Sequence, residues 1–592
     1  MRRALSSLVN RVRSASALAT VRSFASIVIA AVTPWFIGLA VLHQFGLVFY
    51  NPFLTPRVLL FDIAVMALLL YVTLSPTVAI TCYYIVQAVP FVTYYLLRRG
   101  VTFQDVRNLD ELFLTIGLVP RAVVLALLLL LLALAVRANA GRLTRRRIAG
   151  LALIAVVAVI GWRQPARVQA ALYDTAHEFD YNASASFRFY GVVDSLVYST
   201  LHNLAFAREL RERAAEATGE YEDFRSYVPP PAPAPRPNVH LILLESFLDP
   251  YSLASLRIDA GPLQQQWRAW QSGTTATAIA PIMGGASAAS EFELLCGVAS
   301  NVQQYGVEFN RMEGRRTQCL PAYLKTLGYD SYAATPIRGA FFNVATAYKS
   351  VGFDDIRLAD TFDYSDMDGL WLSNESFFDQ QLRFITPKLR GGKPIFSFTF
   401  ALACHSPFAL DEAKRPVTFA LDARYGILQA VSACGYYTIA AVVRYVNAIQ
   451  SLDPHGLIFI LPDHVPPIPV ELLHRAQYRP YSDAPVAITS GNPLEGFINT
   501  VLALNLLPGR MPGVFAYHEL PEIIVDALTD GALCRDRPCS SYRPIMQVGQ
   551  RRFFNRHDLS EVTASRNGED GRTPVAATEA LYRSILRESL AR

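Results

Sequence analysis

The sequence is poor in charged residues and in cysteine. Lys, Arg, Asp and Glu make up 17% of its 592 residues, against roughly 25% in soluble domains. The 7 cysteines and 33 glycines exclude a small disulfide scaffold and a collagen-like chain. The net charge of +5 is too small to indicate nucleic-acid binding. Hydrophobic residues reach 52%, which excludes an intrinsically disordered chain, because disorder needs low hydrophobicity and high charge.

The sequence also has no internal repeat and no repeated CxxC motif. The first absence excludes a repeat array. The second excludes a zinc ribbon.

Long uncharged runs are abundant, and they crowd the first quarter of the chain. Five of them predict membrane spans: Phe24–Leu42, Val58–Leu74, Val78–Leu97, Ala122–Val136 and Ile148–Trp162. A helical span takes roughly 20 residues, so the last two helices must extend beyond their runs. The alternative, buried helices of a soluble protein, is disfavoured because five such runs in succession leave no polar face for water.

The arginines predict the orientation of these spans. One group precedes the first span and another separates the fourth from the fifth: Arg2, Arg3, Arg11, Arg13, Arg22, Arg137, Arg142, Arg145, Arg146 and Arg147. The positive-inside rule places both groups in the cytoplasm, although Arg98 and Arg99 oppose it mildly. Everything after Trp162 is then expected outside the cytoplasm. The first run is too long for a cleaved signal peptide and lacks a clear cleavage site.

Two features of this region leave alternatives open. Asp62 lies inside the second run, where an acid suggests a function, but its place near the outer end also fits simple hydration. The mixed segment Val101–Val119 predicts an amphipathic helix at the outer interface.

The chain divides at a proline-rich linker, Val228–Pro237. After it, short apolar strands alternate with helical stretches, which predicts an α/β domain with a mainly parallel sheet. We therefore expect a membrane domain followed by this soluble domain. The predicted boundaries are 1–23 for a cytoplasmic N-terminus, 24–162 for the membrane domain, 163–237 for an extracytoplasmic helical segment with the linker, 238–530 for the α/β domain and 531–592 for a C-terminal extension.

Six of the seven cysteines fall in the soluble domain. An even number in an exported domain indicates disulfides, and buried free thiols are the alternative. Six cysteines allow 15 connectivities, of which sequential pairing is the simplest: Cys296–Cys319, Cys404–Cys434 and Cys534–Cys539.

Polar residues follow several predicted strands. Glu245 ends Asn238–Leu244, while Asp463 and His464 follow Gly456–Leu461. His405 follows a further strand, Pro394–Leu402. Because the carboxyl ends of parallel strands share one edge of a sheet, these side chains can converge. Two carboxylates and an imidazole suit one divalent metal, Mn²⁺ or Zn²⁺; a structural Asp-His pair is the alternative.

The candidate nucleophile lies in GGASAASEFELLCGV, residues 284–298. Ser287 is expected at a helix N-terminus, where unpaired N–H groups favour an alkoxide or a phosphate. A nearby metal lowers the hydroxyl pKa further. The alternative is that Ser287 or Ser290 only caps the helix.

Five motifs between about Asn238 and Pro467 together resemble the alkaline phosphatase/sulfatase superfamily. They are NVHLILLESF, GGASAASEFELLCG, CLPAYLKTLGY, FALACHSPF and FILPDH. The resemblance is to its membrane-anchored phosphoglycerol and phosphoethanolamine transferases, the group that contains lipoteichoic acid synthase. It implies that Glu245, Asp463 and His464 bind the metal, that Ser287 is nucleophile and metal ligand, and that His405 binds substrate.

The sequence departs from this family in TPIRGAFFNVATAYKSVGF, residues 335–353. Thr335 replaces a histidine, and Val344 replaces an arginine. The resemblance assigns both of the replaced residues to binding the phosphate or head group. Arg338 is a candidate for supplying the lost charge.

The segment Cys319–Tyr323 faintly resembles the formylglycine motif of sulfatases. That motif needs an arginine where Tyr323 stands, and it precedes the helix that Cys319 begins. A formylglycine sulfatase is therefore disfavoured.

The resemblance implies a transferase of a phosphoalcohol group. Its donor would be a phospholipid and its acceptor an envelope glycan, with a covalent phospho-serine on Ser287. One alternative is a phosphodiesterase or other hydrolase of the same fold. Another is a catalytically degenerate binding component of envelope polysaccharide assembly, which Thr335 and Val344 favour and the Glu245–Ser287–Asp463–His464 set opposes.

Overall fold

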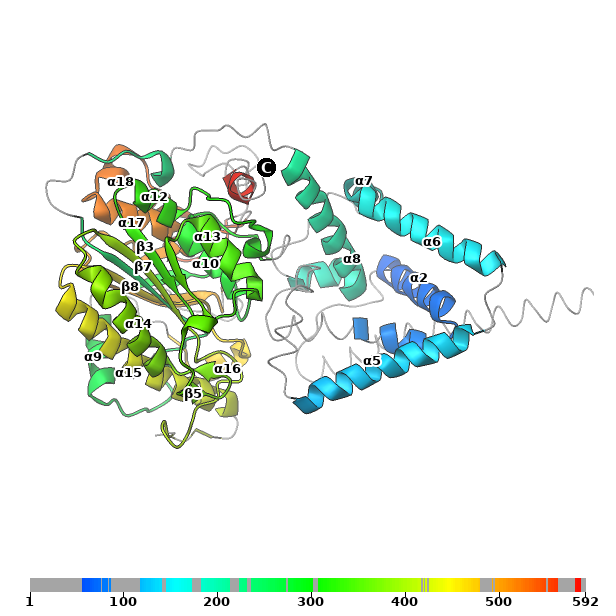
Figure 1. Cartoon of the computed structure of the whole chain (residues 1–592), viewed down its shortest axis with the longest axis horizontal. Coiled ribbons are helices and arrows are strands. Elements are labelled where there is room, and N and C mark those ends of the chain that lie inside the picture. The colour runs from blue at the N-terminus through cyan, green and yellow to red at the C-terminus, as the bar shows by residue number, and fades with distance from the viewer. Residues whose placement is uncertain are drawn as a thin grey trace, which may run out of the picture. The chain divides into compact units, whose positions relative to one another are not determined.

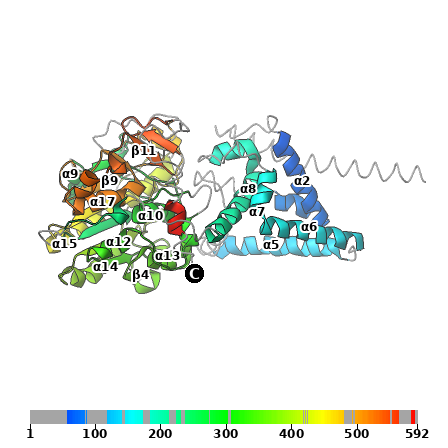
Figure 2. The ribbon, with the colours of Figure 1, turned by 90° about the horizontal axis from the view of Figure 1, so that it is seen from above.

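The computed structural model (Figures 1 and 2) describes most of the chain after residue 55. The described residues are 56–75, 77–83, 85–86, 118–140, 145–172, 183–212, 223–230, 236–272, 275–301, 307–416, 419, 421–422, 425–479, 492, 494, 496–549, 552–562 and 581–586. The predicted first span and the predicted helix at Val101–Val119 lie outside them, apart from the last two residues of that helix.

The chain forms two compact units, and the first ends at Ala205. Its described helices are α2 (Pro56–Thr73), α5 (Leu118–Asn139), α6 (Arg145–Arg163), α7 (Pro165–Leu172) and most of α8 (Ala183–Glu212). Leucine and alanine dominate α5, and both favour helix. Arg137 in its last turn complements the negative end of the helix dipole.

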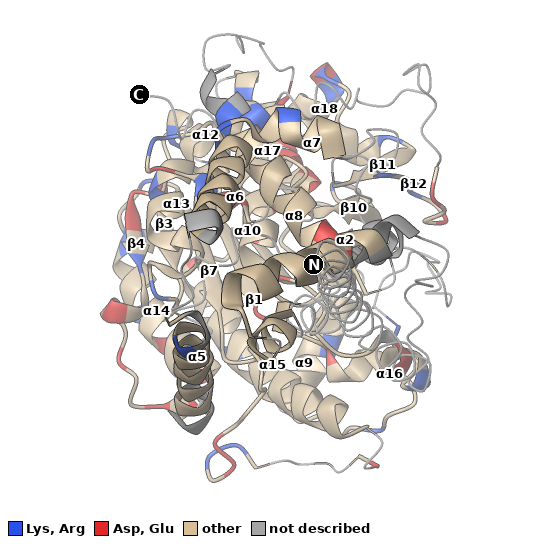
Figure 3. Cartoon of the chain, turned by 90° about the vertical axis from the view of Figure 1, so that its right-hand side faces the viewer, with Lys and Arg blue, Asp and Glu red and all other residues tan. Residues whose placement is uncertain are grey.

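The first unit presents apolar side chains to its surroundings. Leu129 on α5 is 58% exposed and Val157 on α6 is 60% exposed. Figure 3 shows few charged residues along α2, α5 and α6. Asp62 on α2 is an exception to this pattern and is buried.

The prediction of five spans is not confirmed. The second, fourth and fifth predicted runs coincide with α2, α5 and α6, and the last two helices do extend beyond their runs. Among the described helices, only α15 (Gly426–Leu452) is long and apolar enough to cross a membrane by itself, and 67% of its apolar window is buried. The α6–α7 pair passes the same test only if taken together across a bend of 103°.

The second unit is built on an eight-stranded sheet in the order β10-β2-β9-β8-β1-β7-β3-β4. Its strands are β1 (Val239–Leu244), β2 (Thr275–Ile279), β3 (Asp330–Ala334), β4 (Asp355–Arg357), β7 (Ile395–Ala401), β8 (Leu457–Pro462), β9 (Ile498–Leu504) and β10 (Val514–Ala516). β9 pairs antiparallel with β8 and β2, and the other five pairings are parallel. The predicted α/β domain with a mainly parallel sheet is confirmed.

The strands are apolar along their whole length because both faces of the sheet are covered. In β1, Leu241 and Leu243 belong to one buried cluster, and Ile242 and Leu244 belong to another. Side chains of a strand alternate between faces, so the two clusters are the two cores.

Helices cover both faces (Figure 1). The first core takes side chains from α10 (Ser287–Cys296), α12 (Leu320–Thr326), α13 (Val344–Val351), α17 (Leu520–Leu528) and α18 (Ala532–Asp536). The second takes them from α9 (Pro262–Gln271), α14 (Asn374–Leu389) and α15. Smaller elements complete the unit: α16 (Val470–Arg475) and the hairpins β5 (Met367–Asp368)–β6 (Trp371–Leu372) and β11 (Ile545–Val548)–β12 (Arg552–Asn555).

Chain beyond residue 530 contributes to this packing. Arg556 forms an ion pair with buried Glu519, with Nη2–Oε1 2.8 Å apart. Tyr582 is fully buried and donates to Glu308 Oε1 at 3.0 Å. This segment is therefore held to the first core.

The predicted disulfides are confirmed. Cys296–Cys319 joins the end of α10 to the residue before α12, Cys404–Cys434 joins the loop after β7 to α15, and Cys534–Cys539 closes a loop after α18.

Candidate active site

The candidate site lies where β1 and β8 end side by side. The two strands pair in parallel, with Leu244 opposite Pro462. The next residue on each strand is a carboxylate, Glu245 or Asp463. The backbone N–H of Asp463 donates to Leu244 O at 3.1 Å, which continues the ladder to the site. Residues more than 200 positions apart therefore meet because of strand register.

Glu245, Asp463 and His464 each offer one ligand atom within 4.8 Å of the others. All three side chains are buried. Burial first, and the charge of Asp463 second, raise the pKa of Glu245 to about 7. Burial raises the pKa of Asp463 to about 6. A concentration of negative charge in a buried place is costly unless a cation or a proton balances it.

The two oxygens of Asp463 have different surroundings. Oδ1 accepts the backbone N–H groups of Ser246 at 2.7 Å and His464 at 2.8 Å. Oδ2 is buried and accepts no hydrogen bond from the described residues. The carboxylate is thus held by one oxygen and leaves the other available.

His464 presents its second nitrogen to that available oxygen. Its Nδ1 lies 3.0 Å from the carbonyl oxygen of Val465, which can only accept, so we infer that Nδ1 carries the proton. Burial lowers the pKa of the imidazole and favours the neutral ring. Nε2 then has a lone pair, which accepts the N–H of Gly285 at 2.9 Å and lies 3.1 Å from Asp463 Oδ2.

These residues fit a divalent metal ion. Three electron-pair donors lie within 4.8 Å of one another. They are the unbonded Oδ2 of Asp463, the buried carboxylate of Glu245 and Nε2 of the neutral His464 ring. A carboxylate oxygen and an imidazole nitrogen are ligands that Zn²⁺ and Mn²⁺ share. The carbonyl of Val465 holds the imidazole in the tautomer that a metal needs.

Ser287 is the first residue of α10 and lies at this focus. Its Oγ donates to Glu245 Oε2 at 3.1 Å and lies 3.4 Å from His464 Nε2. Gly284, Gly285 and Ala286 approach the helix with φ of 60°, 78° and 62°. A Cβ on Gly284 would stand 2.9 Å from the backbone of Pro467, so only glycine fits this left-handed turn.

Ser290 has a different environment. It is fully buried, and its Oγ donates to the carbonyl oxygen of Asp463 at 2.6 Å. This bond ties α10 to the end of β8 and commits the hydroxyl proton. Ser290 therefore supports the site, and Ser287 is the hydroxyl that faces the donor cluster.

His405 follows β7, and its side chain is partly exposed. A positive charge on His405 would oppose the rise in the Glu245 pKa, so the ring is within electrostatic range of the cluster. The Nδ1 atom lies 3.0 Å from the carbonyl oxygen of Ser406. Nε2 is then the nitrogen left for a substrate or a proton.

The residues singled out in segment 335–353 differ in their exposure to solvent. Thr335 and Val344 are fully buried. Arg338 is exposed. Burial raises the pKa of the Tyr364 hydroxyl and the charge of Arg338 opposes this rise, so the guanidinium lies near that hydroxyl.

Sequence reasoning missed two buried carboxylates that support the site. Glu291 lies one helical turn after Ser287 and accepts the hydroxyl of Tyr348; burial raises its pKa to about 8. The four-residue spacing on one helix face is a signal that would have found it.

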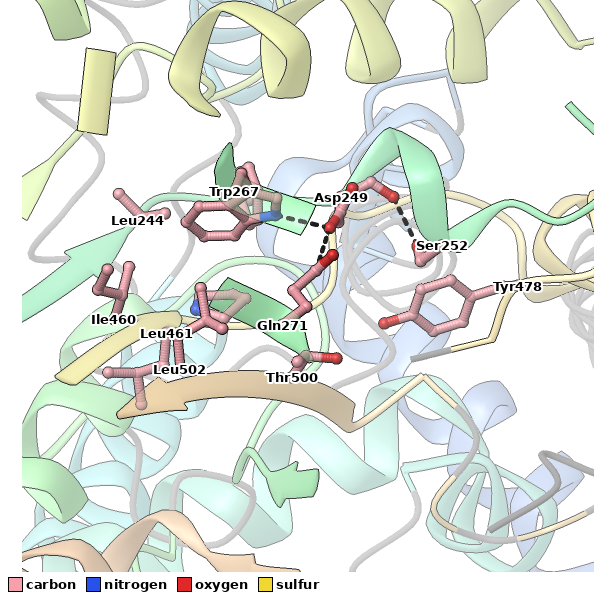
Figure 4. A pocket seen from close by; sticks show the side chains of 12 residues that line it. Leu244, Asp249, Ser252, Trp267, Gln271, Ile460, Leu461, Tyr478, Thr500 and Leu502 are labelled. Carbon is pink, nitrogen blue, oxygen red and sulfur yellow. Dashed lines mark hydrogen bonds between the residues drawn. The ribbon is translucent and has the colours of Figure 1, made fainter. Parts of the chain in front are cut away.

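Asp249 is the second, in the loop after Glu245 (Figure 4). It accepts Trp267 Nε1 at 2.8 Å and Gln271 Nε2 at 2.6 Å, which ties the loop to α9. Beside it lies an interior cavity of about 20 Å³, enough for a single water molecule. Leu244 and Leu461 line this cavity, and the metal-ligand candidates do not. The cavity is therefore not part of the candidate site.

Cys319 is bonded to Cys296 and fully buried. A cysteine in a disulfide is not available for conversion to formylglycine. The disulfide agrees with the exclusion made from the sequence.

Residues 237–485 match the sulfatase family model. No curated protein matches the chain. Solved structures similar to it include the lipoteichoic acid synthase LtaP from Listeria monocytogenes, which is 14% identical, with 65% of this chain and 97% of that chain covered and a TM-score of 0.48. Streptococcus pyogenes phosphoglycerol transferase GacH in complex with sn-glycerol-1-phosphate is 14% identical, with 65% and 92% covered and a TM-score of 0.40.

A third similar structure is the soluble domain of lipooligosaccharide phosphoethanolamine transferase A from Neisseria meningitidis. It is 14% identical, with 52% of this chain and 92% of that chain covered and a TM-score of 0.33. The match to the sulfatase family model covers residues 237–485, which include Glu245, Ser287, Asp463 and His464. The domain that holds this cluster matches the sulfatase family model.

Proposed function

We propose that the protein is a membrane-anchored, metal-dependent transferase that moves a phosphoalcohol group from a phospholipid to an envelope glycan. The observation that carries this proposal is the position of Ser287. Its hydroxyl opens α10, with Oγ 3.1 Å from Glu245 Oε2 and 3.4 Å from His464 Nε2. A hydroxyl at a helix N-terminus beside a cation site is suited to attack on phosphorus.

The metal would be Mn²⁺ or Zn²⁺ held by Glu245, Asp463, His464 and Ser287. When bound, such an ion neutralises phosphate charge and lowers the pKa of a coordinated hydroxyl. The protein's own contribution is orientation. Asp463 is fixed by two backbone N–H groups and His464 by the carbonyl of Val465.

In the first half-reaction, Ser287 Oγ forms a bond to phosphorus and the bond from phosphorus to the diacylglycerol oxygen breaks. Glu245 Oε2 already accepts a hydrogen bond from Ser287 Oγ, so it is the group that takes the proton. The leaving oxygen needs a proton, and His405 Nε2 is the group whose position suits its delivery. In the second half-reaction a glycan hydroxyl oxygen forms a bond to phosphorus and the bond from phosphorus to Ser287 Oγ breaks. The hydroxyl proton goes to His405 Nε2, and Glu245 returns its proton to Ser287 Oγ.

Membrane anchorage follows from the apolar side chains on α2, α5 and α6. Leu60, Leu132 and Trp162 are 67%, 60% and 58% exposed. So many exposed large apolar side chains on neighbouring helices mark a lipid or protein contact. A lipid donor would explain the anchor, and the arginine distribution supports a catalytic domain on the extracytoplasmic side of a bacterial inner membrane.

The test uses the full chain in detergent with Mn²⁺ or Zn²⁺ and a phospholipid. Release of diacylglycerol that requires Ser287 and the metal supports the proposal. Absence of diacylglycerol with phosphatidylglycerol and phosphatidylethanolamine alike contradicts it. Release of the free phosphoalcohol at the same rate as diacylglycerol, with a glycan acceptor present, identifies a hydrolase instead.

A further inference from the structure

The rim of the site contains an aromatic residue with an unmatched hydrogen-bond donor. Trp371, in β6, lies against His405 with ring centroids 4.6 Å apart and planes inclined by 47°. The indole Nε1 is buried and donates to no acceptor among the described residues. A buried donor without an acceptor is costly, and each such group in a native protein calls for a partner.

The short hairpin that carries Trp371 is firmly held. Asp368 in β5 accepts the backbone N–H of Asp411 at 3.0 Å and Arg415 Nη1 at 3.1 Å. Arg415 is buried, as is Asp368. Gly369 at the turn has φ of 60°, and a Cβ there would meet Ala409 at 2.8 Å. The indole is thus placed by a paired and packed scaffold.

Trp371 is close to the reacting groups through His405. His405 lies within electrostatic range of Glu245, and the residue before it is tied to α15 by the Cys404–Cys434 disulfide. Trp371 therefore stands beside the histidine that the proposed function assigns to the substrate.

The chemistry of this rim discriminates between head groups. An N–H needs an acceptor, which a hydroxyl oxygen supplies and a protonated amine does not. The hairpin carboxylates are already committed, because Asp366 and Asp368 both pair with Arg415.

Resting on the proposed function, we propose that Trp371 determines specificity by donating its indole N–H to a hydroxyl oxygen of the transferred group. The substrate class is then a polyol phosphate of the glycerol type, and amino-alcohol phosphates are selected against. His405, whose ring is at the surface, yields to let the oxygen reach the N–H.

The test measures binding of two soluble probes to the full chain. The protein carries Ser287→Ala, so that no covalent step intervenes, and is loaded with metal. The probes are sn-glycerol-1-phosphate and O-phosphoethanolamine. We expect the glycerol phosphate to bind more tightly. Trp371→Phe keeps a ring against His405 and removes the N–H, and should reduce that preference by about tenfold, the effect of one buried hydrogen bond.

Trp270→Phe, a tryptophan on α9, is the matched control and should keep the preference. Equal binding of the two probes, tighter binding of O-phosphoethanolamine, or an unchanged preference in Trp371→Phe overturns the inference. A Trp371-dependent preference in a protein that releases no diacylglycerol from any lipid supports the subsite while contradicting the proposed function. Diacylglycerol release without Trp371-dependent selectivity supports the proposed function and contradicts the subsite.

Discussion

Nε2 of His464 lies 3.1 Å from Oδ2 of Asp463, and with the imidazole proton held on Nδ1 by Val465 both atoms are acceptors. Two acceptors at this distance repel unless a cation or a proton lies between them. A metal ion resolves the conflict and also uses Glu245, whose carboxylate lies in the same cluster. Burial and three hydrogen bonds hold Asp463 and His464 in this arrangement.

Asp463→Asn should abolish metal binding while the domain stays folded. The asparagine carbonyl can keep the two backbone hydrogen bonds that Oδ1 accepts, but an amide NH₂ replaces the free oxygen. Elemental analysis of the purified full chain measures the bound metal. Asp249→Asn is the matched control, because Asp249 is also a buried carboxylate after β1 and lies outside the cluster. Full metal occupancy in Asp463→Asn would remove that residue from the site.

Metal uptake should be steeply pH-dependent. Glu245 and Asp463 have pKa values raised to about 7 and about 6, so protons compete with the metal up to those values. In the metal-free chain, these raised pKa values mean that stability is greatest at low pH and falls as pH rises through about 6 to 7. Added Mn²⁺ or Zn²⁺ should therefore raise Tm more at pH 8 than at pH 5.5. An equal rise at the two pH values would contradict the carboxylate assignment.

Ser290→Ala should lower stability and leave the chemical step intact. The variant loses the hydrogen bond to the carbonyl of Asp463 and leaves that oxygen without this partner. The expected cost is about 1–3 kcal/mol, measured by denaturant unfolding. Ser287→Ala removes one of the proposed ligands but leaves both carboxylates and the imidazole, and it should keep its metal. Loss of the phospho-enzyme in Ser290→Ala at full metal occupancy would show that the wrong serine had been chosen.

The Cys404–Cys434 disulfide should matter for turnover because it immediately precedes His405. Replacing both cysteines by serine frees the loop after β7 and should reduce kcat. The Cys534–Cys539 pair serves as control, since it closes a loop far along the chain. The chain-entropy model gives a stability loss of roughly 3.5 kcal/mol for the first bridge and roughly 2 kcal/mol for the second. Equal kcat in both double variants, at a temperature where both are folded, would exclude a positioning role.

The metal-ligand cluster could be predicted because each of its strands, and the polar residue that follows it, is visible in the sequence. Buried parallel strands are apolar throughout, so a Glu or an Asp-His pair directly after one is conspicuous. Parallel pairing then brings the strand ends together, as the register of Leu244 with Pro462 shows. The three disulfides could also be predicted from the sequence, because sequential pairing is the simplest arrangement of six cysteines in an exported domain.

Other features depend on packing that a sequence does not display. That Thr335 and Val344 are buried is decided by how the loop after β3 and α13 fold against the core. The contact of Trp371 with His405 comes from a hairpin of two-residue strands, too short for any periodicity. The choice between Ser287 and Ser290 was argued from access to helix N–H groups, whereas the structure shows a specific bond from Ser290 to Asp463.

The central claim is that Ser287 carries the phosphoalcohol group between donor and acceptor. The direct measurement is intact-protein and peptide mass spectrometry of the full chain after incubation with metal and a phospholipid donor, without an acceptor. The account predicts a phosphoalcohol adduct on Ser287 that a glycan acceptor discharges, and no adduct in Ser287→Ala. Diacylglycerol release by wild-type protein with no adduct, or release sustained by Ser287→Ala, would contradict it.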